Sequence, residues 1–168
     1  MQIIKASAAK TRLLTIALII FGLMIGIAQA ATKMPAFTLS SVKDGALVKS
    51  SSYQGQVILI NFFATWCPPC RKEIPDFIKL QKEYGARGFT VIGISTDQGG
   101  AAQVEKFAQK MEINYPVLLS EAKTPEAFGG IIGIPTSFLV NREGNVVKRY
   151  DGYADPQTLA NDLKAILK

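Results

Sequence analysis

The run VILINFF at residues 57–63 constrains the fold of this 168-residue chain more than any other feature. Its residues are apolar on both alternating faces except for one asparagine, so a strand formed by it has no side suited to water. Such a strand lies at the centre of a sheet that is covered on both faces. A second apolar run at residues 90–95 follows a segment with helical periodicity, and strands joined through a helix are parallel. The sequence therefore predicts an α/β fold.

The other segments complete a single domain over residues 31–168, with a mixed central sheet, helices on both faces and an extra N-terminal β-hairpin. The expected helices have apolar residues at helical spacing and cover residues 67–84, 101–111 and 156–167, with a single turn at 125–128. The expected strands are short and bounded by turn residues, and cover residues 36–39, 47–49, 116–119, 136–140 and 146–150.

Residues 1–30 have the composition of an export signal. A basic start without any acid precedes an apolar run at residues 13–28, and Ala28 and Ala30 form the small-residue pattern of a signal-peptidase site. The alternative is an uncleaved signal anchor, because a helix near the lower limit of ~17 residues can still cross a bilayer. The domain is expected to be exported with either interpretation. It would be periplasmic after cleavage, or it would be attached through residues 13–28 to the outer face of the cytoplasmic membrane.

The charge distribution does not indicate a nucleic-acid partner. The formal charge is +6, but three basic residues belong to the export signal, and the remainder has 16 basic against 13 acidic residues. Charges of opposite sign are interspersed there, as in Arg71-Lys72-Glu73, without a basic run. This pattern is typical of a solvated surface.

The chain contains two cysteines, Cys67 and Cys70, and no histidine. A structural zinc or iron–sulfur site needs further ligands, and a haem attachment signal needs a histidine where Arg71 stands. The sequence therefore predicts neither a metal nor a cofactor, and a Cys–His hydrolase is excluded. A bond between cysteines three residues apart restrains little of the unfolded chain, which favours a reactive role over a structural one.

The cysteine pair stands where the strand at 57–63 meets the helix at 67–84. Unpaired N–H groups and the helix dipole at such a terminus stabilise a thiolate, and can lower its pKa from about 8.5 to roughly 3.5–7.5. We therefore expect Cys67 to be the nucleophile. Cys70, one turn into the helix and expected to be more buried, would resolve the mixed disulfide and form the Cys67–Cys70 redox disulfide. Pro68 and Pro69 suit the first helical turn.

The segment NFFATWCPPCRKEIP at residues 61–75 closely resembles the TlpA/ResA-like branch of the thioredoxin superfamily. The segment GIPTSFL at residues 133–139 is similar to the cis-proline loop of these proteins, and the likeness extends from about Pro35 to the C-terminus. The resemblance implies a thioredoxin-like fold and thiol–disulfide oxidoreductase activity, in a protein that we expect to be a monomer.

The resemblance also implies the residues that bind substrate. Pro135 would be a cis proline facing Cys67, with Ile134 and Thr136 beside it and their backbone free to pair with a substrate strand. Trp66 would pack beside the cysteines. The alternatives are an ordinary edge-strand proline at Pro135 and a plain core aromatic at Trp66.

Glu73 follows Cys70 by three residues in the expected helix, so the two can share a face. In proteins of this branch an acid at that position lies close to the cysteines, which implies that Glu73 handles the proton of the resolving thiol. A glutamate on the solvent face of the helix is the alternative. Asn61 stands where cytosolic thioredoxin has a buried aspartate, so that base is missing here.

The resemblance favours a disulfide reductase for exported proteins, fed by a membrane thiol donor of the CcdA/DsbD type and active in cytochrome c maturation. One alternative is a peroxiredoxin-like antioxidant enzyme, but its pattern P-x-x-x-T-x-x-C is broken by Ile60 and Ala64. The other alternative is a binding module in which the cysteines are dispensable. Only thiol–disulfide exchange uses both cysteines as they are placed.

Overall fold

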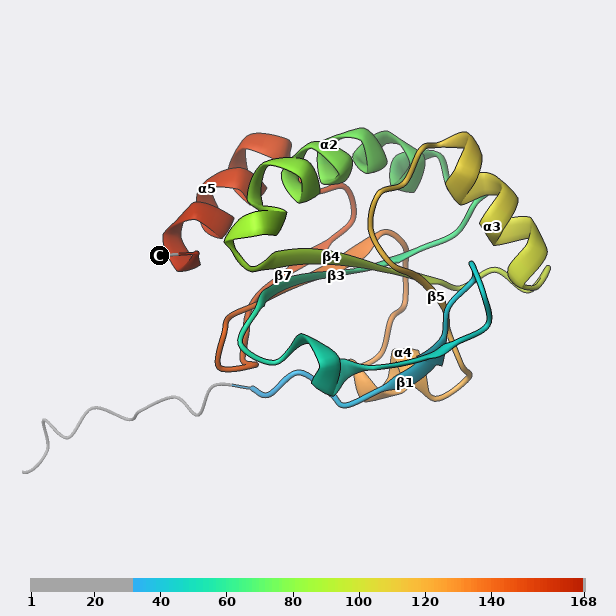
Figure 1. Ribbon diagram of the computed structural model, residues 1–168, viewed down its shortest axis with the longest axis horizontal. Coiled ribbons are helices and arrows are strands. Elements are labelled where there is room, and N and C mark those ends of the chain that lie inside the picture. Colours follow the sequence, from blue (N-terminus) through green and yellow to red (C-terminus); the bar gives the residue numbers. More distant parts are fainter. Residues whose placement is uncertain (1–31, 168) are drawn as a thin grey trace, which may run out of the picture. The chain divides into compact units, whose positions relative to one another are not determined.

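The computed structural model of the protein describes residues 32–167, so the expected signal peptide or anchor lies outside the described residues. A five-stranded mixed sheet runs through this part of the chain in the order β5-β4-β3-β6-β7 (Figure 1). Strands β3, β4 and β5 are parallel, β6 is antiparallel to β3, and β7 is antiparallel to β6. The strands are β3 (Val57–Phe63), β4 (Phe89–Ser95), β5 (Val117–Leu119), β6 (Thr136–Val140) and β7 (Val146–Asp151).

Strand β3 lies at the centre of the sheet, and all seven of its residues are buried. Alternate side chains enter two separate clusters, so that Leu59 and Phe63 pack on one face and Ile60 and Phe62 on the other. This confirms the prediction that both faces of the strand are covered.

The two faces of the sheet are covered differently (Figure 1). One face packs against α2 (Pro68–Tyr84), α3 (Ala101–Lys110) and α5 (Pro156–Ile166), whose apolar residues join the cluster of Leu59 and Phe63. The other carries the hairpin of β1 (Thr38–Ser40) and β2 (Leu47–Lys49) together with the short α4 (Thr124–Ala127). Two 3-10 turns, η1 (Ser50–Tyr53) and η2 (Gly85–Arg87), complete the elements. The expected thioredoxin-like fold with an N-terminal hairpin is confirmed.

The topology brings three loops to one edge of the sheet. β3 and β4 are parallel and both end at this edge, while β6 runs the opposite way and begins there, with Phe62 paired to Thr136. The loop before α2, the loop before α3 and the loop before β6 therefore meet. The cysteine pair stands in the first of them.

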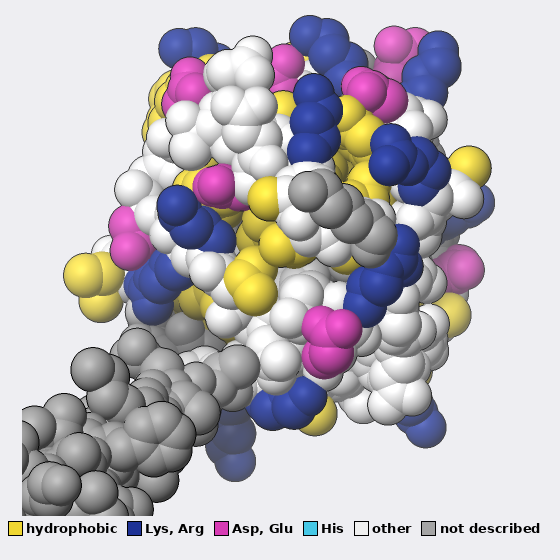
Figure 2. Space-filling view, turned by 90° about the vertical axis from the view of Figure 1, so that its left-hand side faces the viewer, with side chains coloured by type: hydrophobic (Ala, Val, Ile, Leu, Met, Phe, Trp, Pro, Cys, Tyr) yellow, Lys and Arg dark blue, Asp and Glu magenta, His cyan; other side chains and the backbone are white. Residues whose placement is uncertain are grey.

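Charges of both signs are spread over the surface. On the face shown in Figure 2, acidic side chains lie among the basic ones, as the sequence pattern predicts. Several are paired, including Lys148 with Asp162 at 3.4 Å and Lys79 with Asp76 at 3.2 Å. Within residues 32–167, no helix has both the length and the apolar character needed to cross a membrane.

Candidate active site

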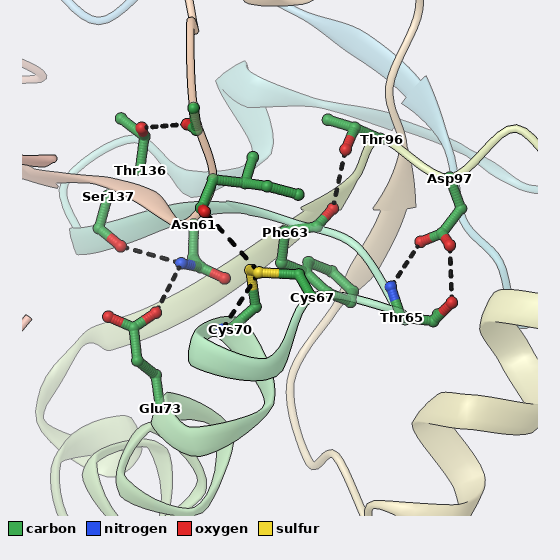
Figure 3. Close-up of a disulfide and its surroundings, with 12 residues drawn as sticks. Asn61, Phe63, Thr65, Cys67, Cys70, Glu73, Thr96, Asp97, Thr136 and Ser137 are labelled. Carbon is green, nitrogen blue, oxygen red and sulfur yellow. Dashed lines mark hydrogen bonds between the residues drawn. A yellow bond between two sulfur atoms is a disulfide. The ribbon is translucent and has the colours of Figure 1, made fainter. Parts of the chain in front are cut away.

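Cys67 occupies the position directly before the first residue of α2, and its side chain caps the helix. Its Sγ accepts a hydrogen bond from the backbone N–H of Cys70 at 3.3 Å. The two cysteines form a disulfide, with their Cα atoms 5.3 Å apart (Figure 3). The helix starts at Pro68, one residue later than expected, because Cys67 serves as the cap.

The first turn of α2 offers one N–H group to the sulfur of Cys67. Pro68 and Pro69 occupy the first two helical positions and have no N–H, so the donor is that of Cys70. Burial does not distinguish the two cysteines as strongly as we expected, because both are buried, with 3% of Cys67 and 1% of Cys70 exposed. The expected difference in reactivity between Cys67 and Cys70 therefore rests on the hydrogen bond to the Cys67 sulfur and on its position at the helix terminus.

This geometry predicts that, in the reduced protein near pH 7, iodoacetamide alkylates Cys67 at least about tenfold faster than Cys70. The N–H bond and the helix terminus favour the Cys67 thiolate, and the thiolate is the reactive form. Mass spectrometry of tryptic peptides at several times gives both rates. Equal rates, or faster labelling of Cys70, would contradict the assignment of nucleophile and resolver.

The loop before β6 lies against the cysteine pair. The Ile134–Pro135 peptide bond is cis, and the carbonyl oxygen of Ile134 lies 3.7 Å from Sγ of Cys67. The disulfide sulfur has no proton, so this is a contact here, whereas a Cys67 thiol could donate to the same oxygen. The loop is braced by hydrogen bonds from Thr136 Oγ1 to the Gly133 carbonyl at 2.8 Å and from the Gly152 N–H to the Pro135 carbonyl at 2.9 Å.

Large apolar side chains next to the disulfide are exposed to solvent. Trp66 is 68% exposed, so its interpretation as a plain core aromatic is wrong. Ile132, in the same loop as Ile134, is fully exposed, and Tyr153, in the loop between β7 and α5, is 38% exposed. Ile132 and Tyr153 were not among the site residues predicted from the sequence, because an apolar residue in a loop carries no periodic signal.

Glu73 is buried, with only 1% of the residue exposed, so its interpretation as a glutamate on the solvent face is wrong. Its carboxylate accepts the backbone N–H of Ala154 at 2.6 Å and lies 3.5 Å from Nδ2 of Asn61. Asn61 also donates to Oγ of Ser137 at 2.9 Å, which fixes its orientation (Figure 3). Burial raises the pKa of Glu73 from 4.5 to about 7, against the lowering effect of the two hydrogen bonds.

Asp97 holds the loop that carries the cysteines, and it was not among the site residues predicted from the sequence. Its carboxylate accepts the N–H of Thr65 at 2.9 Å and the Thr65 hydroxyl at 2.6 Å (Figure 3). It also accepts the Ser95 hydroxyl at 2.8 Å. Thr65 precedes Cys67 by two residues, so these bonds fix the approach to the helix. An aspartate directly after a buried parallel strand is a signal that could have found it.

Known proteins of similar sequence and structure include thiol–disulfide oxidoreductases. Residues 29–167 match the Redoxin family. The thiol-disulfide oxidoreductase ResA of Bacillus thuringiensis subsp. konkukian is 29% identical over 138 residues, which cover 82% of this chain and 79% of that protein. ResA of Bacillus subtilis is 30% identical over 118 residues, or 70% of this chain and 65% of that protein.

Two solved structures from Chlorobium tepidum have similar folds. One, described as a putative thiol:disulfide interchange protein DsbE, is 33% identical with a TM-score of 0.76. The other, described as a thiol:disulfide interchange protein of the thioredoxin family, is 38% identical with a TM-score of 0.75. Each match covers 82% of this chain and 97% of the other.

Proposed function

We propose that this chain, which belongs to the Redoxin family as a TlpA/ResA-like member of the thioredoxin superfamily, reduces disulfide bonds in exported proteins. It is an oxidoreductase, and its Cys67–Cys70 pair carries out thiol–disulfide exchange. The observation that carries the proposal is the position of Cys67, whose sulfur caps α2 and accepts the N–H of Cys70. In our proposal the exchange takes place outside the cytoplasm, after export directed by residues 1–30.

The first step is attack of the Cys67 thiolate on one sulfur of the partner's disulfide. A new S–S bond forms between Cys67 and the partner, the partner's S–S bond breaks, and the leaving thiolate takes a proton from water. The helix terminus and the Cys70 N–H stabilise the attacking thiolate. Ile134, Pro135, Thr136 and Trp66 are the residues that we propose to hold the partner's chain during this step.

The second step is resolution by Cys70. Its thiol loses a proton and attacks Sγ of Cys67, which forms the Cys67–Cys70 disulfide and releases the second partner thiolate. We propose that the Glu73 carboxylate takes this proton, because burial brings its pKa to about 7, where it can both accept and release a proton near neutral pH. The partner gains two electrons and this chain loses two.

A return of two electrons and two protons is then needed to reduce the Cys67–Cys70 disulfide again. We propose a membrane thiol donor of the CcdA/DsbD type for this step, and exported apocytochrome c, which carries its own cysteine pair, as one substrate. A peroxidase mechanism is disfavoured, because the threonine and proline positions of a peroxidatic site are occupied by the buried Ala64 and Ile60.

The direction of electron flow is tested by a redox titration of the Cys67–Cys70 pair against glutathione or dithiothreitol. A strongly stabilised thiolate makes a pair oxidising, and the two prolines leave Cys67 with a single N–H donor from the first turn. We therefore expect a potential nearer to about −270 mV, as in thioredoxin, than to about −120 mV, as in DsbA. A potential near about −120 mV would contradict the proposed reductase activity and would indicate an oxidase instead.

A further inference from the structure

Exposed apolar residues stand in the loops around the disulfide. Among residues 32–167, five large apolar side chains are exposed, and Trp66, Ile132 and Tyr153 belong to loops that border the cysteine pair. Trp66 precedes Cys67, and Ile132 is two residues from Ile134, whose carbonyl touches Sγ of Cys67. Exposed apolar groups in loops beside a reactive disulfide can contact the chain that brings the partner disulfide.

Two exposed cations follow Cys70 in α2, and each lies over an aromatic ring of a different neighbouring segment. The guanidinium of Arg71 lies 6.0 Å from the ring centroid of Phe107, and Nζ of Lys72 lies 4.5 Å from that of Tyr153. Both residues are exposed, and within the described part of the chain neither is in a salt bridge. The aromatic rings hold the charges in place, so less side-chain freedom is lost when an anion binds.

The acids of the surrounding segments already have partners within the domain. Glu73 is buried against the Ala154 N–H and is not available to a ligand from solvent. The others are bonded to nearby side chains or N–H groups: Asp76 to Lys79, Asp97 to Thr65 and Ser95, Asp151 to Arg149, and Asp155 to Thr158. Hydrogen bonds to neutral groups leave the charges of Asp97 and Asp155 in place, but they occupy oxygens of both carboxylates. Arg71 and Lys72 are exposed, and within residues 32–167 neither is in a salt bridge, so these two cations can pair with an incoming acid.

We propose that this surface selects extended polypeptide segments in which the reacting cysteine stands beside an apolar residue and is flanked by acidic residues. The apolar side chain would contact Trp66, Ile132 and Tyr153, and the acids would pair with Arg71 and Lys72. This inference rests on the proposed disulfide exchange at Cys67 and adds the chemistry of its substrate.

The test uses the reduced full-length protein and three synthetic peptides. Each peptide carries one cysteine, which is held as a mixed disulfide with 2-mercaptoethanol. A leucine precedes this cysteine, and the two residues on each side of the Leu-Cys pair are all Glu, all Gln or all Lys. The second-order rate constant for release of the peptide thiol is measured at low and high salt. We expect the Glu peptide to react about two- to tenfold faster than the Lys peptide, with Gln between them, and the ratio to shrink in salt.

The variant Arg71→Glu/Lys72→Glu is expected to invert the Glu-to-Lys ratio. The ratio of the two rate constants is compared because all peptides react with the same sulfur. Any change in the reactivity of Cys67 therefore cancels from this ratio. The matched control is Lys110→Glu/Lys164→Glu, which makes the same change in net charge at exposed positions near the far ends of α3 and α5. It is expected to leave the preference for the Glu peptide in place.

The apolar contact has its own comparison. A Glu peptide with serine in place of leucine is expected to react several-fold more slowly with the wild-type protein, because less apolar surface is removed from water. Ile132→Gln is expected to reduce this difference. Leu47→Gln changes another exposed apolar residue, in β2 and outside the loops that border the cysteines, and is expected to preserve the difference.

Equal rates for the three peptides, or an equal shift of the ratio in the control variant, would overturn the proposed selectivity. The neutral 2-hydroxyethyl disulfide separates this failure from failure of the exchange itself. If the reduced protein consumes it while the peptides react alike, only the selectivity is wrong. If Cys67 does not react with it at all, the proposed function falls as well.

Discussion

Cys70→Ala is expected to accumulate mixed disulfides with exported partners, whereas Cys67→Ala is expected to lose insulin reduction down to the rate of buffer alone. In the first variant the nucleophile still attacks, but nothing within the protein attacks Sγ of Cys67 to release the partner. In the second variant the sulfur at the helix terminus is absent, and Cys70 is buried behind it with 1% exposure. The products are seen on non-reducing gels after the thiols are blocked with maleimide.

Loss of folding does not account for this outcome. The disulfide joins residues three apart, so its removal changes the entropy of the unfolded chain little, and both variants should keep the wild-type circular dichroism spectrum. The trapped partner should be released by dithiothreitol. Full insulin reduction by both variants would reject the exchange mechanism and favour the binding module.

The stability of the wild-type protein is expected to fall as the pH rises from about 4.5 to 7, and Glu73→Gln is expected to remove most of this slope. The pKa of Glu73 is raised from 4.5 to about 7 in the folded protein, chiefly by burial. In this window the folded state binds more protons than the unfolded state, so raising the pH favours unfolding. The stabilisation is full below pH 4.5 and is lost by about pH 7, and amounts to roughly 2–3 kcal/mol.

The protein has no histidine, and the pKa values of Asp44 and Asp155 are lowered, chiefly by backbone N–H bonds from Ala46 and Thr158. These two carboxylates contribute stability above their unfolded pKa of about 4 and lose it only at lower pH. The slope between pH 4.5 and 7 therefore reports mainly on Glu73.

Urea unfolding at half-unit steps of pH measures the slope for the wild type, for Glu73→Gln and for a control, Glu126→Gln, at an exposed position of α4. The slopes are compared rather than the absolute stabilities, because replacing the Glu73 carboxylate by an amide also changes its contact with Nδ2 of Asn61. That change affects the stability at every pH, whereas the slope reports the titration. The control should follow the wild type. Parallel curves for wild type and Glu73→Gln would show that the buried carboxyl does not titrate as described.

Patterns within single segments predicted the elements of this fold well. The apolar run at 57–63 became the central strand with unchanged bounds, and the predicted strands at 47–49 and 136–140 are also unchanged. Helix ends moved by a residue or two, as at Cys67, which caps α2 instead of starting it. Local patterns succeed here because the periodicity of apolar residues reports directly which faces of an element must leave water.

The environment of Glu73 could not be predicted in the same way. Glu73 directly follows Arg71 and Lys72, and a run of three charged residues in a helix is typical of a solvent face. It is buried because the loop between β7 and α5 crosses over it, and the bonded N–H of Ala154 is 81 positions away in sequence. Asn61 and Ser137, which are 76 positions apart, meet on paired strands of the sheet.

The sequence by itself determined the order of the elements, the central strand and the reactive pair, because each depends on the spacing of residues within one segment. Only the tertiary structure decided that Glu73 is buried with a pKa near 7, that Asp97 holds the loop of Thr65, and that Trp66 faces solvent. These properties arise where loops from distant parts of the chain meet at one edge of the sheet. Burial and hydrogen bonding there depend on neighbours that no pattern within a single segment specifies.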